Sequence, residues 1–314
     1  MSKVGVVYVF QRSSSGNWRL ATKLRAPTPI ANDHFGFSVD LSLDGLTLKA
    51  DGYGSWDPVT GKPKFRSQIF LLKGTSWFSS DTLTGYYGGD KCENTRLSGN
   101  GKVLAMICSN FPNGGPHILT YSRNVDSWFP NYTLGPVSFN YEGPRVGSAI
   151  DFDGSHHAMQ DTTNRWTTVV IFHGPFADVG VSSPLPPDED PSAFKNFGYA
   201  IAMDRVANLL AISDISAAEA GAGVSPIMMP GAERRGAVYI YIRRGLPGFT
   251  ALYLRSVVKS PNPEVGDNFA KTLAICGTGH ALAVGAETEN SKARGIDGDR
   301  NDNSSPYSGA VYLY

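Results

Sequence analysis

The 314-residue chain carries 28 basic and 28 acidic side chains, so no net field favours binding to nucleic acid or to an anionic membrane. A hydrophobic content of 41% with 35 glycines and 20 prolines is typical of many short strands joined by turns. No apolar run approaches the roughly 18 residues of a membrane helix, and residues 1–12 lack a signal-peptide pattern. We therefore expect neither a membrane-spanning segment nor a classical leader.

One strand type recurs six times along the chain. Each copy is a short apolar run, generally rich in aromatic and β-branched residues, which favours strand over helix. The copies lie at 5–10, 67–72, 117–121, 168–172, 236–241 and 309–314. A period of roughly 50 to 70 residues is typical of propeller and solenoid repeats with long loops.

Other strand signals surround each copy. First-strand signals precede it at 35–39, 95–97, 146–150, 197–201 and 269–275, and turn residues such as Asp44-Gly45 follow each of them. Such pairs tolerate positive φ and predict tight hairpins. Fourth strands are expected at 18–24, 77–83, 128–134 and 249–254, the first three beginning with Trp. In the remaining unit, residues 174–191 indicate a Pro-rich loop instead of a fourth strand.

The last quarter, 267–314, holds a complete copy of the unit. Phe269-Ala270, Val284-Gly285-Ala286 and the strand SGAVYLY at 308–314 together resemble the FG-GAP repeat of integrin-α-type β-propellers, in the bacterial and environmental subfamily that ends in an SGAVYVF-like strand. The resemblance implies an all-β fold, a β-propeller of four-stranded antiparallel blades in one domain over 1–314. It also implies a secreted, surface or virus-particle location.

The repeats are expected at 35–84, 93–138, 146–183, 197–258 and 267–314, with residues 1–34 as closing strands. Five blades are favoured, and six or seven with atypical ones are the alternative. Segments 5–10 and 309–314 both read as third strands, so one is surplus to a closed ring. An elaborated last blade, a longer chain, or pairing of the N-terminal hairpin with another subunit would each account for it.

The resemblance raises the question of whether this chain binds calcium. Integrin-like propellers bind it in a D-x-D-x-D-G loop between the first and second strands, but here those connections are tight turns that offer too few oxygens. The nearest remnant is Asp151-Phe152-Asp153-Gly154, which we interpret as a strand end followed by a turn.

A second candidate metal site lies in the loop before the last strand. Its alternating oxygen-bearing residues resemble the opening of an EF-hand loop, although Asp302 replaces the glycine and Ser308 the glutamate. The alternative is a turn organised by Asx hydrogen bonds. The candidate ligands are Asp297, Asp299, Asn301 and Asn303.

The three cysteines, Cys92, Cys108 and Cys276, are too few for a disulfide-rich scaffold. Cys92 and Cys108 are equidistant from Asn100, the centre of a predicted hairpin, so they can face each other across two strands. We interpret them as buried reduced thiols, because free cysteine is a common core residue, and leave pairing open.

No catalytic motif is present, and the chain is expected not to be an enzyme. His156 and His157 are adjacent, so in a strand they point to opposite faces and cannot share a metal ion. A glycosidase-type hydrolase is the least favoured alternative, because carboxylate pairs are set by geometry that the sequence does not show.

Long, irregular loops form the remaining candidate site. In the resembled fold the loops 51–66, 109–116, 214–235 and 287–308 gather on one face with 26–34, 185–196 and 260–268. Tyr53, Trp56 and Tyr307 are candidate anchors for a partner, unless each is packed under its loop. We expect a protein-binding, adhesion or particle-assembly module, and the sequence leaves open whether the chain forms an oligomer or a larger assembly. The alternative, a glycan-binding propeller, is disfavoured because the loops differ from unit to unit.

Overall fold

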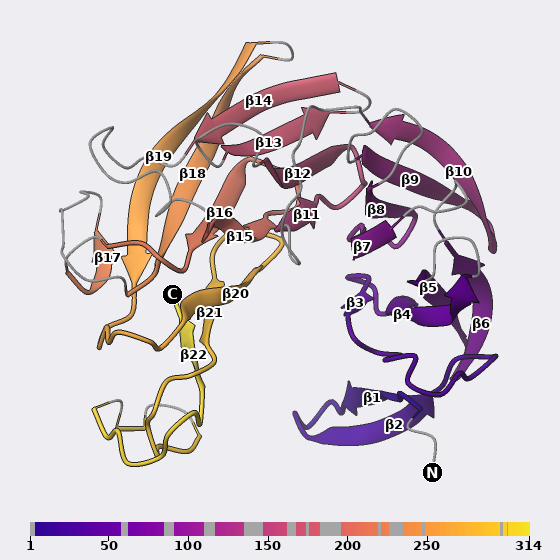
Figure 1. Cartoon of the computed structure of the whole chain (residues 1–314), viewed down its shortest axis with the longest axis horizontal. Helices are drawn as coiled ribbons and strands as arrows, with labels where there is room; N and C mark the ends of the chain where they lie inside the picture. The colour runs from indigo at the N-terminus through magenta and orange to yellow at the C-terminus, as the bar shows by residue number, and fades with distance from the viewer. Residues whose placement is uncertain are drawn as a thin grey trace. The chain divides into compact units, whose positions relative to one another are not determined.

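The computed structural model describes residues 4–57, 62–84, 91–109, 117–134, 147–161, 168–173, 176–182, 196–218, 221–225, 235–246, 249–295, 298–299 and 301–314. Those ranges contain antiparallel strands and no α-helix, which confirms the all-β prediction (Figure 1). In the same ranges no helix long and apolar enough to span a membrane is found. The chain forms two compact units, Met1–Ser138 and Phe139–Tyr314, which are described separately.

The described residues of the first unit form three sheets. β1 (Val7–Arg12) pairs with β2 (Trp18–Leu24). The second sheet has the order β3-β4-β5-β6, with β3 (Val39–Leu41), β4 (Thr47–Asp57), β5 (Lys62–Lys73) and β6 (Ser76–Leu83). The third has the order β7-β8-β9-β10, with β7 (Lys91–Leu97), β8 (Val103–Ser109), β9 (His117–Asn124) and β10 (Ser127–Leu134).

Three sheets also form within the part of the second unit that the structure describes. The first has the order β11-β12-β13-β14, with β11 (Ser148–Ile150), β12 (His156–Asp161), β13 (Thr168–His173) and β14 (Phe176–Ser182). The next has the order β15-β16-β18-β19-β17, with β15 (Phe197–Met203), β16 (Leu209–Asp214), β17 (Gly223–Ser225), β18 (Ala237–Leu246) and β19 (Phe249–Lys259). The last joins β20 (Phe269–Ile275), β21 (Leu282–Ala286) and β22 (Ala310–Leu313).

Four strands depart from the sequence prediction: β4 and β5 extend over 51–57 and 62–66 of a predicted loop, and β14 and β17 were not expected. β14 lies inside 174–191, which was expected to be a loop, and it pairs with β13 along its length. The prolines of this range stand before or after the strand and none lies within it, so they do not break its ladder. β17 is an additional short strand on the outer side of β19.

The hairpins between first and second strands share one bonding pattern. In each, a residue at the end of the first strand accepts, on its side chain, the backbone N–H of the residue five positions later. These accepting residues are Ser42, Ser98, Asp151, Asp204 and Cys276. Asp151 also accepts the Gly154 N–H at 2.9 Å, so the 151–154 segment is a strand end with a turn, as predicted.

Backbone hydrogen bonds join neighbouring turns within each unit. The Leu43 N–H donates to the Gly99 carbonyl at 2.8 Å. In the second unit the Phe152 N–H donates to Arg205 at 3.1 Å, and the Arg205 N–H donates to Gly277 at 3.0 Å. The inner ends of successive sheets are thereby held together.

Apolar side chains fill the seams between successive sheets of the first unit. In one seam Trp77 of β6 packs on a cluster that includes Val7 and Leu24 of the preceding sheet. In the next seam Trp128 of β10 belongs to a cluster with Ile69 and Leu71 of sheet β3–β6. The fourth strand therefore contributes a tryptophan to the core on both occasions.

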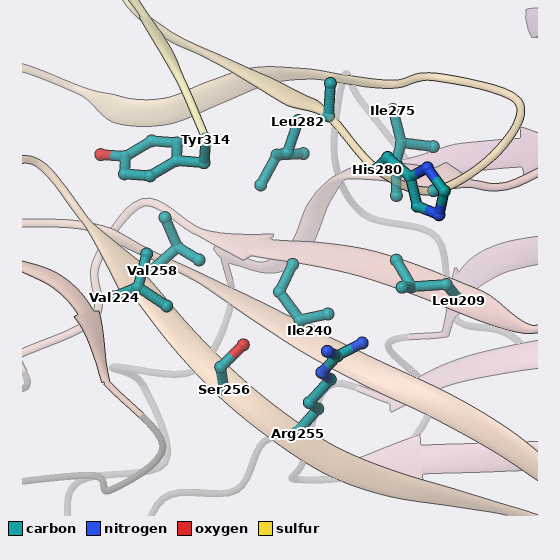
Figure 2. A pocket seen from close by; sticks show the side chains of 12 residues that line it. Leu209, Val224, Ile240, Arg255, Ser256, Val258, Ile275, His280, Leu282 and Tyr314 are labelled. Carbon is teal, nitrogen blue, oxygen red and sulfur yellow. The ribbon is translucent and has the colours of Figure 1, made fainter.

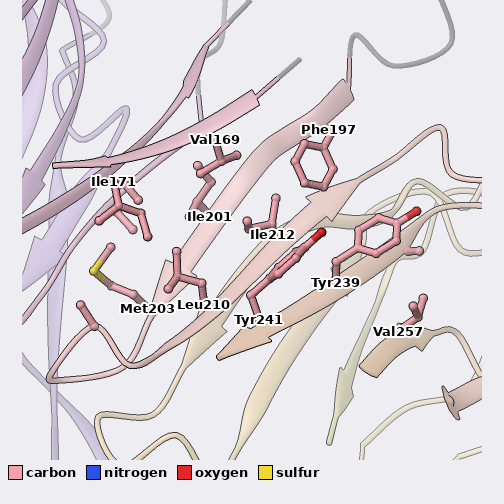
Figure 3. Packing of buried hydrophobic residues seen from close by; sticks show 14 of the residues in the cluster. Val169, Ile171, Phe197, Ile201, Met203, Leu210, Ile212, Tyr239, Tyr241 and Val257 are labelled. Atoms are coloured by element: carbon pink, nitrogen blue, oxygen red, sulfur yellow. The ribbon is translucent and has the colours of Figure 1, made fainter. Parts of the chain in front are cut away.

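The second unit has two corresponding seams. Between sheets β11–β14 and β15–β19, Ile171 and Phe197 pack with Val257 of the outer strand β19 (Figure 3). Between β15–β19 and β20–β22, the core contains Ile240, Val258 and residues of β20 and β21. No fourth strand of sheet β20–β22 is present among the described residues to contribute to this seam.

Cys92 and Cys108 are directly paired in the β7–β8 ladder and form a disulfide. The interpretation of these residues as reduced thiols is therefore wrong. Antiparallel partners bring Cβ atoms within bonding reach, which outweighs the general preference for free buried cysteine. Cys276 is free and half-buried.

A candidate binding site along strand β22

The backbone of β22 is bonded on one side only among the described residues. Leu282 and Tyr314 exchange N–H···O=C bonds of 2.9 Å in both directions. Because bonded and non-bonded pairs alternate in an antiparallel ladder, the N–H and C=O groups of Val311 and Leu313 point away from β21. They form the outer edge of the sheet.

The side chains on this edge are apolar and open to solvent. Val311 is 69% exposed and Leu313 is 76% exposed. The β21–β22 ladder has no register shift, and β22 contains neither proline nor charge. By contrast, the outer strand β10 carries Pro130 and a shift between Pro130 and Thr133. Such features block edge pairing in natural sheets, and β22 lacks them.

Hydrogen bonds to side chains join the two ends of the loop before β22. The Ser308 hydroxyl donates to the carbonyls of Glu289 and Ser291, at 3.1 and 2.5 Å. The Tyr307 N–H donates to Asn290 Oδ1 at 3.0 Å, and the Tyr307 side chain is 77% exposed. Tyr307 is thus exposed in the loop that leads into β22, and its role as a partner anchor stays a prediction.

The loops 260–268 and 287–308, predicted to share a face, contact each other. Asn303 Nδ2 donates to Glu264 Oε1 at 2.7 Å, and the Thr288 N–H donates to the Asp267 carbonyl at 3.3 Å. Tyr312 reaches the same loop through its hydroxyl, which is 2.9 Å from an Asn262 oxygen. The edge strand and both loops therefore form one surface.

Two hollows flank the edge. One, with a volume of about 660 Å³, is lined by residues 309–314 together with Glu289 and Ser291. The other, of about 390 Å³, is bordered by Thr272, Glu287 and Val311.

Three carboxylates of this surface, Glu264, Asp267 and Glu289, lie close enough to interact electrostatically. Burial raises the pKa of Asp267 to about 6, and the negative charges of Glu264 and Glu289 contribute to this increase. Glu289 is 1% exposed; its Oε2 accepts the Ser291 N–H at 2.9 Å, while its Oε1 has no partner among the described residues.

The structure gives the described candidate calcium ligands other partners. Asp299 Oδ1 accepts the Asn301 N–H at 3.0 Å, an Asx turn, and Asn303 donates to Glu264. Asp297 lies outside the described residues. Among those described, no three His, Cys, Asp or Glu side chains form a metal-binding group. Calcium binding stays a prediction, and Asx bonding accounts for Asp299.

The remaining predicted anchors lie in the first unit. Tyr53 lies in strand β4 and not in a loop; it is half-buried, with edge-on ring contacts to His34 and Phe65 at centroid distances of 6.1 and 6.4 Å, and it packs against the core. Trp56 belongs to β4, opposite Pro63, and its side chain lies outside the described residues. The edge of β22 was not predicted, because a strand sequence does not reveal which side is paired.

Comparison with solved structures identifies the architecture. No family model matches the sequence, and no curated protein matches it. The β-propeller domain of Myceliophteria thermophila Cps50 (Swd1) is 11% identical with a TM-score of 0.50, over 90% of this chain and 76% of that one. The fold is that of a β-propeller. Sheets β3–β6, β7–β10, β11–β14, β15–β19 and β20–β22 are its blades.

Other propellers match with lower scores. The β-propeller domain of the trilobed protease from Pyrococcus furiosus is 11% identical with a TM-score of 0.45, over 86% of this chain. TolB from Acinetobacter baumannii is 13% identical with a TM-score of 0.42, over 80% of this chain. The chain spans 65% of the first of these proteins and 48% of the second.

Proposed function

We propose that this β-propeller is a non-enzymatic protein-binding module that takes up an extended segment of a partner polypeptide along β22. One observation carries the proposal: Val311 and Leu313 direct backbone donors and acceptors outward from an uncharged strand. In strand addition the main-chain bonds supply affinity, and pockets for alternate side chains supply specificity.

The surroundings of the edge support this use. The exposed side chains of Val265, Tyr307, Val311 and Leu313 all belong to the last blade and its adjoining loop. Aromatic and aliphatic groups that remain exposed together are typical of interaction surfaces.

A proline at position 313 tests the proposal. The Leu313 N–H points to the edge, so Leu313→Pro removes an outward donor and leaves the bonds of Tyr312 and Tyr314 to β21 in place. The probe is a fluorescein-labelled synthetic peptide with the sequence of β6, SWFSSDTL (76–83), titrated by fluorescence anisotropy. We expect at least about a tenfold weaker affinity, equivalent to ~1.4 kcal/mol.

Leu313→Val is the matched control, because it keeps the donor and an apolar side chain. Its affinity is expected to stay within about twofold of wild type. Absence of peptide binding to the wild-type chain, or equal binding by Leu313→Pro, would overturn strand addition at β22.

A further inference from the structure

The seams between blades show what an outer strand contributes. Trp77 pairs with Leu72, and Trp128 pairs with Arg123, at corresponding places in their blades. The N–H of Leu72 donates to the Leu46 carbonyl, and the N–H of Arg123 donates to the Lys102 carbonyl. Both tryptophans therefore lie level with the hairpin turn of their own blade.

The position that corresponds to Trp77 and Trp128, beside the hairpin turn, can be located in the last blade. Leu46 and Lys102 are each four residues beyond the turn-capping serine, Ser42 or Ser98. In the last blade the capping residue is Cys276, so the corresponding residue is His280. His280 lines a cavity of about 410 Å³ in the seam between blades β15–β19 and β20–β22.

The walls of this cavity are apolar and come from both blades. Figure 2 shows Leu209, Ile240, Val258 and Leu282 around the shared space, with Tyr314 toward one end and Arg255 with His280 toward the other. Ile240, Val258 and Leu282 belong to the buried core of the seam. The cavity thus lies where Trp128 fills the seam of the first unit, against the outer strands of the preceding blade.

We propose that the partner segment carries a tryptophan whose indole enters this cavity while the following residues pair with β22. This inference rests on the proposed strand addition. The chain's own outer strands define the chemistry: β6 reads SWFSSDTL and β10 reads SWFPNYTL, each with Trp six residues before Leu.

The polar residues at the cavity suit an indole. Arg255 is exposed and lines the wall, so its guanidinium can lie over the ring face, an arrangement that favours tryptophan among the aromatic residues. Ser256 supplies a hydroxyl that can accept the indole N–H. An aliphatic side chain would use neither group.

Register places the partner on the exposed edge. In the complete blade, Ser79 pairs with Phe70 and Leu83 pairs with Ser67, so the residues after Trp77 run along the third strand. In the last blade, the partner residues that follow the tryptophan would pair with the stretch from Tyr314 back to Val311. This stretch contains the outward-pointing backbone N–H and C=O groups of Leu313 and Val311. One segment therefore occupies the edge and the cavity together.

The test combines two peptides with one filled cavity. The labelled peptide SWFSSDTL and its Trp77→Ala form are titrated against the wild-type chain and against Ser256→Phe, which narrows the cavity from a half-buried strand position. We expect the tryptophan peptide to bind wild type at least about tenfold more tightly than the alanine peptide. In Ser256→Phe this difference is expected to disappear, with the alanine peptide unaffected.

The outcomes separate this inference from the proposed function. Equal binding of both peptides to wild type, lost in Leu313→Pro, would overturn the indole site and leave strand addition intact. Absence of binding by either peptide would overturn both. A dimer detected by light scattering that peptide dissociates would assign the edge to a second copy and overturn the partner segment.

Discussion

The seam in front of blade β7–β10 and the seam in front of blade β20–β22 differ in one element. In the first, the outer strand β10 inserts Trp128, which is 7% exposed, between two blades. In the second, the blade has three strands among the described residues, and a cavity and an unpaired edge lie at the corresponding places. Among the described residues, the unpaired edge and the cavity therefore lie together in the blade that shows three strands.

The largest expected effect is a loss of stability when the seam in front of blade β7–β10 loses its tryptophan. Trp128→Ala removes the side chain that packs against the preceding blade and should destabilise the chain by about 3–5 kcal/mol. Urea denaturation followed by circular dichroism measures the change. Phe129→Ala is the control, because Phe129 follows on the same strand, is 54% exposed and should change stability by less than about 0.5 kcal/mol. Equal effects of the two substitutions would contradict the role of Trp128.

The disulfide of blade β7–β10 supplies the next largest effect. Cys92 and Cys108 close a loop with a sequence separation of 16, so replacing both by Ala should lower the free energy of unfolding by about 3 kcal/mol. Denaturation with and without dithiothreitol measures it, with Cys276→Ser as the control for the free thiol. Titration of three free thiols in the unfolded, unreduced protein would contradict the pairing.

A smaller, pH-dependent effect belongs to the last blade. The pKa of Asp267 is raised to about 6, so the folded state holds a proton more tightly than the unfolded state and the charged form costs stability above that pH. Asp267→Asn should stabilise by about 2 kcal/mol at pH 7, and the gain should shrink as pH falls through 6 and vanish near 4. Thermal melting between pH 4 and 8 measures it.

Asp299→Asn is the control for this prediction, because Asp299 is exposed and an asparagine keeps its Asx bond. It should leave the melting temperature unchanged at every pH. If Asp267→Asn stabilised the protein equally at pH 4 and pH 7, the result would contradict a free-energy cost of ionising the Asp267 carboxyl group.

Sequence patterns predicted most strands because turn chemistry and apolar runs are local properties. The tight turns capped by Ser42 and Ser98 and the Trp-led outer strands are examples. β14 was not predicted because residues 174–191 were interpreted as one Pro-rich loop, although the strand within them, Phe176–Ser182, contains no proline. The β22 edge and the cavity beside Leu282 depend on which strands pair and pack, so no local pattern encodes them.

The bonds between neighbouring turns bear on how such repeats diverge. Leu43, Gly99, Phe152, Arg205 and Gly277 occupy the same position of their turns yet share no side-chain chemistry. Because only main-chain atoms take part, substitution at this position leaves the bond available. Sequence drift can therefore erase the likeness between repeats while the main-chain bonds between their turns remain.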